Sequence, residues 1–190
     1  MVDTLAKAFI ETIKLKDLYT FNHSKNVCKY SLRIGEELNL EKVTLDNLRY
    51  ASLLHDIGKV SIPETILHKS TSLTEKEYIE IKKHSMIGAN LLKKMNLNDE
   101  IVKGVRHHHE FINGQGYPNG LKKEGIPLIA RIISIADAFD AMTSTRPYRG
   151  PLSTKKTLKE LNECRGIQFD SEIVDVFINL IKKGDLLATG

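Results

Sequence analysis

The sequence predicts an all-α protein, a single-domain helical bundle with one Gly/Pro-rich loop. Three observations carry this prediction. Apolar residues recur with helical spacing along almost the whole chain, glycine and proline concentrate in residues 113–127, and a chain of 190 residues suits one domain with a sizeable core. No internal repeat, low-complexity tract or linker interrupts the pattern, so we expect one domain over residues 1–190, with its core over about 17–177.

The first half of the chain shows amphipathic spacing at i, i+3, i+4 and i+7. It predicts a helix over about 3–18, which we interpret as an appended helix or a dimer contact. A second helix is expected around 27–38. A third, around 45–54, ends in a fully apolar turn, which predicts a central position in the bundle.

The second half begins with Thr74-Glu75-Lys76-Glu77, a capping box that opens a long helix reaching Leu92. Further helices are predicted over about 99–109, 128–143, 154–164 and 171–181. Between two of them, residues 113–127 hold four of the twelve glycines. A loop of this length inside a compact helical domain is usually functional.

Composition narrows the class of protein. The net charge is 28 − 24 = +4 and the lysine pairs, such as Lys82-Lys83, are short and scattered, so we expect solvated helix faces and no DNA or RNA polymer as partner. No apolar stretch approaches the ~20 residues of a membrane span. No signal peptide is evident at the N-terminus, and the two cysteines, Cys28 and Cys164, favour a reducing, cytoplasmic setting.

The pair His55-Asp56 stands at the end of an apolar helix, where a buried polar side chain must be paired or bind a metal. Gly58 is expected to let the chain leave this helix. Taken alone, the pair is also explained by a capping aspartate beside a hydrogen-bonded histidine.

Further candidates change the balance. His84 lies within a predicted helix, His108 and His109 end another, and Asp137 interrupts an apolar helix. Taken one at a time, each has a structural explanation: His84 as a surface histidine, His108 and His109 as an exposed helix end, and Asp137 as a buried structural acid. Together with His55-Asp56 they supply four imidazoles and two carboxylates without a thiolate. That donor set favours iron or manganese, with nickel, cobalt and zinc as alternatives, and six ligands suggest two divalent metal ions.

Four motifs in this order, His-Asp-Ile-Gly-Lys (55–59), His-His-Glu (108–110), Gly-Tyr-Pro (116–118) and Arg-Pro-Tyr-Arg (146–149), resemble the HD-GYP family. This family of bacterial signalling phosphodiesterases is a branch of the HD-domain metal-dependent phosphohydrolases. The resemblance covers about residues 17–177. It implies an HD-type helical bundle that hydrolyses cyclic di-GMP to linear pGpG and/or GMP through a metal-bridging hydroxide.

The resemblance also assigns residues. Asp56 is implied as the bridging ligand of the two ions and, with Lys59, as a catalytic residue. Lys59, Arg146 and Arg149 are expected to meet the phosphate charge, and Tyr117 to contact a phosphate or a guanine, or else merely to anchor the loop. The implied metal ligands are His55, Asp56, His84, His108, His109 and Asp137.

Three residues carry less definite expectations. Some family members hold a third ion through a glutamate and a histidine, but here the histidine is His23 and the glutamate position is Tyr19. We therefore expect two ions, with His23 as a pocket histidine that contacts substrate or metal. Glu110 is expected to orient a ligand histidine, and Asp140 to hold the loop together.

Two other functions stay open. The domain could sense cyclic di-GMP or dock a partner with little turnover, or it could hydrolyse another cyclic dinucleotide or a nucleotide monoester. Expected partners are cyclic di-GMP, a sensory or receiver domain or a diguanylate cyclase, and a second copy of the chain.

Overall fold

A computed structural model describes residues 8–11, 14, 18–67, 69, 71–145 and 150–184. Within these ranges the chain is helical, and its only extended pairing is an isolated bridge between Arg165 and Phe169. The predicted all-α class is confirmed. The helices are α2 (Leu18–Glu37), α3 (Lys42–Leu54), η1 (Ile57–Ser61), α4 (Glu64–Leu67), α5 (Glu75–Lys94), α6 (Asp99–His107), η2 (Lys123–Gly125), α7 (Leu128–Thr143), α8 (Thr154–Glu163) and α9 (Ser171–Lys182).

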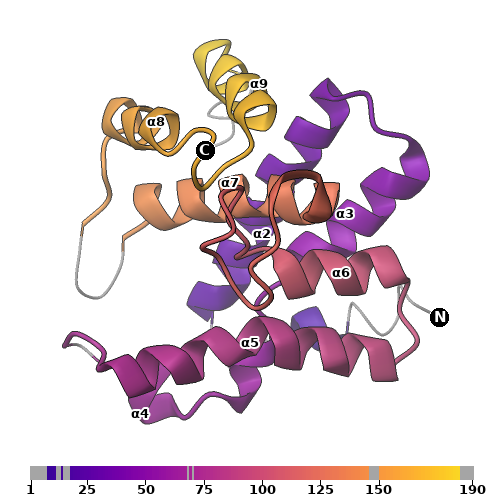
Figure 1. The fold of residues 1–190 in the computed structure, drawn as a ribbon, viewed down its shortest axis with the longest axis vertical. Coiled ribbons are helices and arrows are strands. Elements are labelled where there is room, and N and C mark those ends of the chain that lie inside the picture. Colours follow the sequence, from indigo (N-terminus) through magenta and orange to yellow (C-terminus); the bar gives the residue numbers. More distant parts are fainter. Residues whose placement is uncertain are drawn as a thin grey trace.

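Helix α7 is the centre of the bundle, with α2, α3, α6, α8 and α9 packed around it (Figure 1). Its sequence is apolar on almost every face, as expected for a helix surrounded by others. The ring of Phe139 on α7 lies 5.1 Å from that of Tyr30 on α2 and 4.9 Å from that of Phe177 on α9. These edge-to-face contacts join three helices in one core.

Helices α5 and α6 run side by side beneath this core (Figure 1). The predicted capping box at the start of α5 is confirmed: the Glu77 N–H donates to Thr74 Oγ1 at 3.3 Å, and the Thr74 N–H donates to Glu77 Oε2 at 2.7 Å. Helix α5 also packs against η1. Through these contacts it brings His84 towards the His55-Asp56 pair.

Gly58 has a different role from the predicted one. The α-helical hydrogen bonding of α3 stops before Gly58, which lies inside η1. A Cβ on Gly58 would lie 1.9 Å from the backbone oxygen of His84. Glycine is therefore required because η1 and α5 touch through their backbones.

The elements that the periodicity did not predict, η1, α4 and η2, are three to five residues long, too short to show a helical repeat. Of the predicted first helix, residues 8–11 are described and helical. Arg146, Arg149 and the side chain of Tyr19 fall outside the described residues. Among the helices that are described, none has the length and apolar character needed to cross a membrane.

Candidate metal centre

The predicted ligands come together from four separate elements at one place in the bundle. His55 and Asp56 follow α3, His84 comes from the middle of α5, His108 and His109 follow α6, and Asp137 comes from α7. Together with His23 they form three groups, and within each group the ligand atoms all lie within 4.8 Å of one another. The groups are His84/His108/His109, His55/Asp56/His108 and His23/His55/Asp137.

Three of the histidines share one hydrogen-bond pattern. In His55, His84 and His108, Nδ1 lies 2.7 Å from the backbone oxygen of the residue three positions earlier. A carbonyl oxygen can only accept, so each Nδ1 carries the hydrogen. In the neutral ring, Nε2 then keeps a lone pair for a metal, which is the usual arrangement of metal-binding histidines.

These lone pairs face one another without a proton between them. The Nε2 atoms of His84 and His108 are 3.4 Å apart, and the buried Nε2 of His55 has no hydrogen-bond partner. Burial lowers the pKa of both His84 and His108, and it lowers the pKa of His109 to about 3. Protons are therefore disfavoured on the rings of His84, His108 and His109, and a divalent cation would satisfy their lone pairs. The donor set fits a metal centre.

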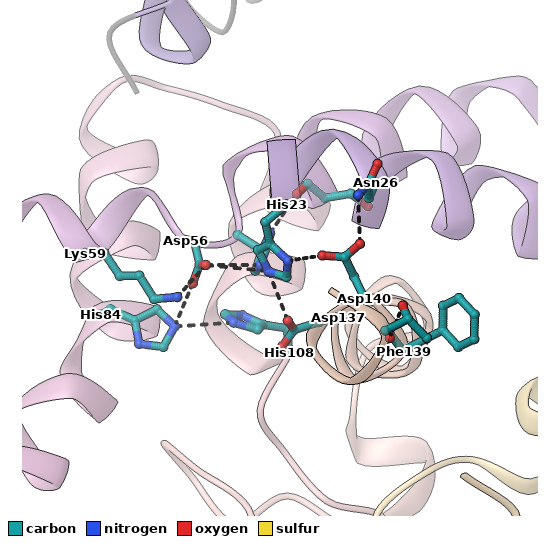
Figure 2. Close-up of polar contacts among 12 residues, drawn as sticks. His23, Asn26, Asp56, Lys59, His84, His108, Asp137, Phe139 and Asp140 are labelled. Atoms are coloured by element: carbon teal, nitrogen blue, oxygen red, sulfur yellow. Dashed lines mark hydrogen bonds and ion pairs between the residues drawn. The ribbon is translucent and has the colours of Figure 1, made fainter. Parts of the chain in front are cut away.

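Asp56 lies between His84 and His23 (Figure 2). Its Oδ1 is 3.5 Å from His84 Nε2, and its Oδ2 is 3.4 Å from His55 Nε2. Burial raises the pKa of Asp56, but the neighbouring Lys59, His55 and His84 outweigh this effect and hold the pKa well below its usual range. The carboxylate is thus ionised, with one oxygen towards His84 and the other towards His55, a geometry that allows it to bridge two cations.

Lys59 lies in η1 at the edge of this centre. Its Nζ donates to Asp56 Oδ2 at 2.5 Å, and its side chain is 29% exposed, against 3% for Asp56. The ammonium therefore stands between the buried carboxylate and solvent, where an incoming anion would meet it first.

His23 on α2 is more closely tied to the centre than its sequence indicated. Its Nε2 lies 3.1 Å from Asp137 Oδ1, and its Nδ1 lies 2.6 Å from Asp140 Oδ2 (Figure 2). Burial lowers the pKa of His23, yet the hydrogen bonds to the two carboxylates prevail and raise the pKa to about 9. Desolvation raises the pKa of Asp137, but the same contact with His23 outweighs this effect and holds the pKa below its usual range. His23 therefore shares a group with two predicted ligands.

Two acids make contacts that the sequence did not indicate. Among the residues that the structure describes, the Asp140 carboxylate accepts hydrogen bonds from His23 and, at 2.8 Å, from Nδ2 of Asn26, both on α2. Glu110 holds the loop, because its carboxylate accepts from the backbone N–H groups of Asn119 at 2.7 Å and Leu121 at 3.0 Å. The histidine next to Glu110 is His107, at 3.4 Å, which is not a predicted ligand.

The Gly-Tyr-Pro turn docks on the end of α6. The Tyr117 N–H donates to the His109 oxygen at 3.0 Å, and the Tyr117 ring centroid is 4.8 Å from that of His109. A Cβ on Gly116 would lie 2.2 Å from the Phe111 nitrogen, so only glycine allows this approach. Burial raises the pKa of Tyr117, which keeps its hydroxyl protonated as a hydrogen-bond donor.

Asn26 is the site residue that sequence reasoning missed. It lies three positions after His23, on the same face of α2, and fixes the carboxylate that holds His23. The spacing His-x-x-Asn was the available signal, but it has no meaning until Asp140 is known to lie opposite.

The comparisons with known proteins agree with this geometry. The family model described as "HD domain" matches residues 7–173. The chain belongs to the HD-domain family. The HD-GYP resemblance is confirmed by curated sequence relatives that are named cyclic di-GMP phosphodiesterases.

Two curated relatives show how similar the chain is. It is 38% identical to a cyclic di-GMP phosphodiesterase of Thermotoga maritima, over 88% of this chain and 46% of the relative. It is 35% identical to 3'3'-cGAMP-specific phosphodiesterase 1 of Vibrio cholerae, over 92% of this chain and 41% of the relative. This HD domain thus spans less than half the length of these relatives.

Solved structures share the fold. An HD-GYP protein of Bdellovibrio bacteriovorus gives a TM-score of 0.70 at 22% identity, covering 84% of this chain and 51% of that one. The HD domain of the Listeria monocytogenes phosphodiesterase PgpH in complex with cyclic-di-AMP gives 0.69 at 18% identity, covering 96% and 98%. At sequence identities this low, the structural similarity shows only that the chain shares the HD fold.

Proposed function

We propose that this HD domain is a metal-dependent phosphodiesterase that hydrolyses cyclic di-GMP to linear pGpG and/or GMP. The observation that carries the proposal is the ionised Asp56, whose Oδ1 faces Nε2 of His84 and whose Oδ2 faces Nε2 of His55. The Thermotoga relative, a cyclic di-GMP phosphodiesterase, supports the choice of substrate.

In this proposal two divalent ions bind, iron or manganese by preference because the donors are imidazole and carboxylate. His84, His108 and His109 would hold one ion, and His55 and Asp137 the other, with His23 beside it and Asp56 shared. When bound, two such ions supply Lewis-acid catalysis to phosphodiester hydrolysis.

The remaining residues bind and orient the substrate. The ammonium of Lys59, now paired with Asp56, would meet a phosphate oxygen that arrives at the centre. The protonated hydroxyl of Tyr117 would donate to a phosphate or guanine oxygen. Glu110 fixes the loop that carries Tyr117, so it acts on substrate position rather than on metal binding.

The test is hydrolysis of cyclic di-GMP by anaerobically prepared protein reconstituted with Fe(II) or Mn(II), with products separated by chromatography. We expect pGpG or GMP, and loss of both metal and activity in Asp56→Ala. A metal-loaded protein that binds cyclic di-GMP without turnover would instead indicate a sensing module. Binding unchanged in metal-free Asp56→Ala would contradict the catalytic assignment.

A second substrate, 3'3'-cGAMP, is favoured by the Vibrio relative of that specificity. This dinucleotide has the same cyclic sugar-phosphate backbone as cyclic di-GMP, but adenine replaces one of the two guanines. Comparing kcat/KM for the two dinucleotides on one metal-loaded preparation decides between them, and a nucleotide monoester serves as a third substrate.

A further inference from the structure

Lys82 on α5 lies over two aromatic rings. Its Nζ is 4.5 Å from the centroid of Tyr78 and 5.2 Å from that of Tyr117. The sequence predicted that Lys82 and Lys83 share a solvated face, but the two differ. Lys83 is exposed and its Nζ is 2.5 Å from Glu80 Oε2, whereas Lys82 is half-buried.

These three residues, the Tyr78–Lys82–Tyr117 array, continue directly from the metal centre. Tyr117 packs against His109, with centroids 4.8 Å apart, and His109 packs against His84 at 5.1 Å. The ring of Tyr117 thus contacts both Lys82 and the predicted ligand His109. The array is an extension of the same site.

The charge of Lys82 is not neutralised within the described residues. Lys59 is paired with Asp56, but Lys82 forms no ion pair with any carboxylate there. The rings of Tyr78 and Tyr117 attract the ammonium through their π faces and hold it at one place. A fixed cation that lacks an anionic partner, beside a phosphodiester site, is suited to a second phosphate.

We infer that Lys82 binds the non-scissile phosphate of a cyclic dinucleotide and that Tyr78 positions its ammonium. The inference rests on the proposed function, since a cyclic dinucleotide carries two phosphodiesters and only one can be cleaved at the metal centre at a time. Lys59, in contact with Asp56, serves the scissile phosphate. Lys82, which lies over the ring of Tyr117, is placed for the other.

The test compares two substrates on metal-loaded protein. Cyclic di-GMP has the second phosphate, and bis(p-nitrophenyl) phosphate has only one. In Lys82→Gln we expect the ratio of kcat/KM for cyclic di-GMP to that for the small diester to fall about tenfold, mainly through KM, the loss typical of one charge-assisted contact. Lys82→Arg should restore most of the ratio, and Tyr78→Ala should lower it less than Lys82→Gln.

Lys83→Gln is the matched control, because it removes the same charge one residue away and should leave the ratio unchanged. If Lys82→Gln leaves the ratio unchanged, or if Lys83→Gln lowers it equally, the inference is overturned. Circular dichroism of each variant checks that the fold is retained.

The Kd of cyclic di-GMP, measured by calorimetry, separates this inference from the proposed function. A wild-type protein that binds cyclic di-GMP without hydrolysing it contradicts the proposed catalysis, yet an approximately tenfold weaker Kd in Lys82→Gln would still support the Lys82 contact. An unchanged Kd would overturn it, and a wild-type protein that neither binds nor hydrolyses cyclic di-GMP or 3'3'-cGAMP would overturn both.

Discussion

Nδ1 of His23 lies 2.6 Å from Oδ2 of Asp140, a buried contact between residues 117 positions apart. The other oxygen of Asp140 is held by Asn26, so the carboxylate cannot rotate freely. Because Nδ1 is engaged in this way, Nε2 of His23 is directed at Asp137, at 3.1 Å, and towards Asp56, at 3.9 Å. Asp140 therefore orients a histidine of the metal centre without belonging to any of its ligand groups.

The first prediction concerns Asp140→Asn, which keeps the shape of the side chain but removes the charge that His23 faces. Loss of a carboxylate behind a metal-site histidine typically weakens metal binding by about 10–100-fold. We expect a weakening in that range, measured by competition with a chelating dye. Asp46→Asn, an exposed acid on α3, is the control. Lower thermal stability with unchanged metal affinity would assign Asp140 a packing role only.

The second prediction concerns the number of ions. The groups His84/His108/His109 and His23/His55/Asp137 share no residue, and Asp56 lies between them. We expect two ions per chain in anaerobically purified protein, one in His109→Ala or His55→Ala, and none in Asp56→Ala. Elemental analysis against protein concentration measures this. Three ions per chain would show that His23 helps to hold an additional ion despite Tyr19.

Much of the fold was predictable because its signals are local. The capping box at Thr74 and Glu77 and the apolar stripe behind it need only a few consecutive residues, and α5 begins one residue after Thr74. The long loop was likewise visible as a concentration of glycine and proline. Local sequence patterns of this kind predict helices and loops without any knowledge of tertiary contacts.

The roles of individual site residues depended on contacts that no local pattern encodes. Glu110 reaches the backbone of Asn119 and Leu121 across the loop, and Asp140 reaches α2 across the bundle. Both residues are buried acids with a histidine nearby, so the residue type alone could not distinguish the role of Glu110 from that of Asp140. The packing of α2 on α7 decided which acid orients a histidine.

The third prediction concerns Gly58. A methyl group there would meet the His84 oxygen at 1.9 Å and the Gly88 nitrogen at 2.7 Å, both backbone atoms that cannot move aside independently. We expect Gly58→Ala to lower the free energy of unfolding by about 3 kcal/mol, at the upper end of overpacking effects, and to weaken metal binding because η1 must move away from α5. Urea denaturation and a metal titration measure the two effects.

Gly125→Ala is the matched control for that variant. Nothing lies within 4 Å of a Cβ built on Gly125, so we expect the free energy of unfolding to change by less than about 0.5 kcal/mol. Equal losses in the two variants would mean that the contact between η1 and α5 tolerates a side chain.

The last prediction concerns stability at low pH. The hydrogen bonds from Lys69 and then from Thr74 lower the pKa of Glu77 to about 2, below its usual value. A carboxylate whose pKa is lower in the folded state stabilises the protein above its unfolded pKa, near 4.3, and this contribution is lost as the pH falls towards 2. Glu77→Gln should therefore lower the melting temperature most near neutral pH, with the difference from wild type shrinking through about pH 4 to pH 2. Lys69→Gln, which removes the largest cause of the shift, should flatten the same profile. A difference between wild type and Glu77→Gln that stays constant across this range would show that the capping contact does not depend on the charge of Glu77.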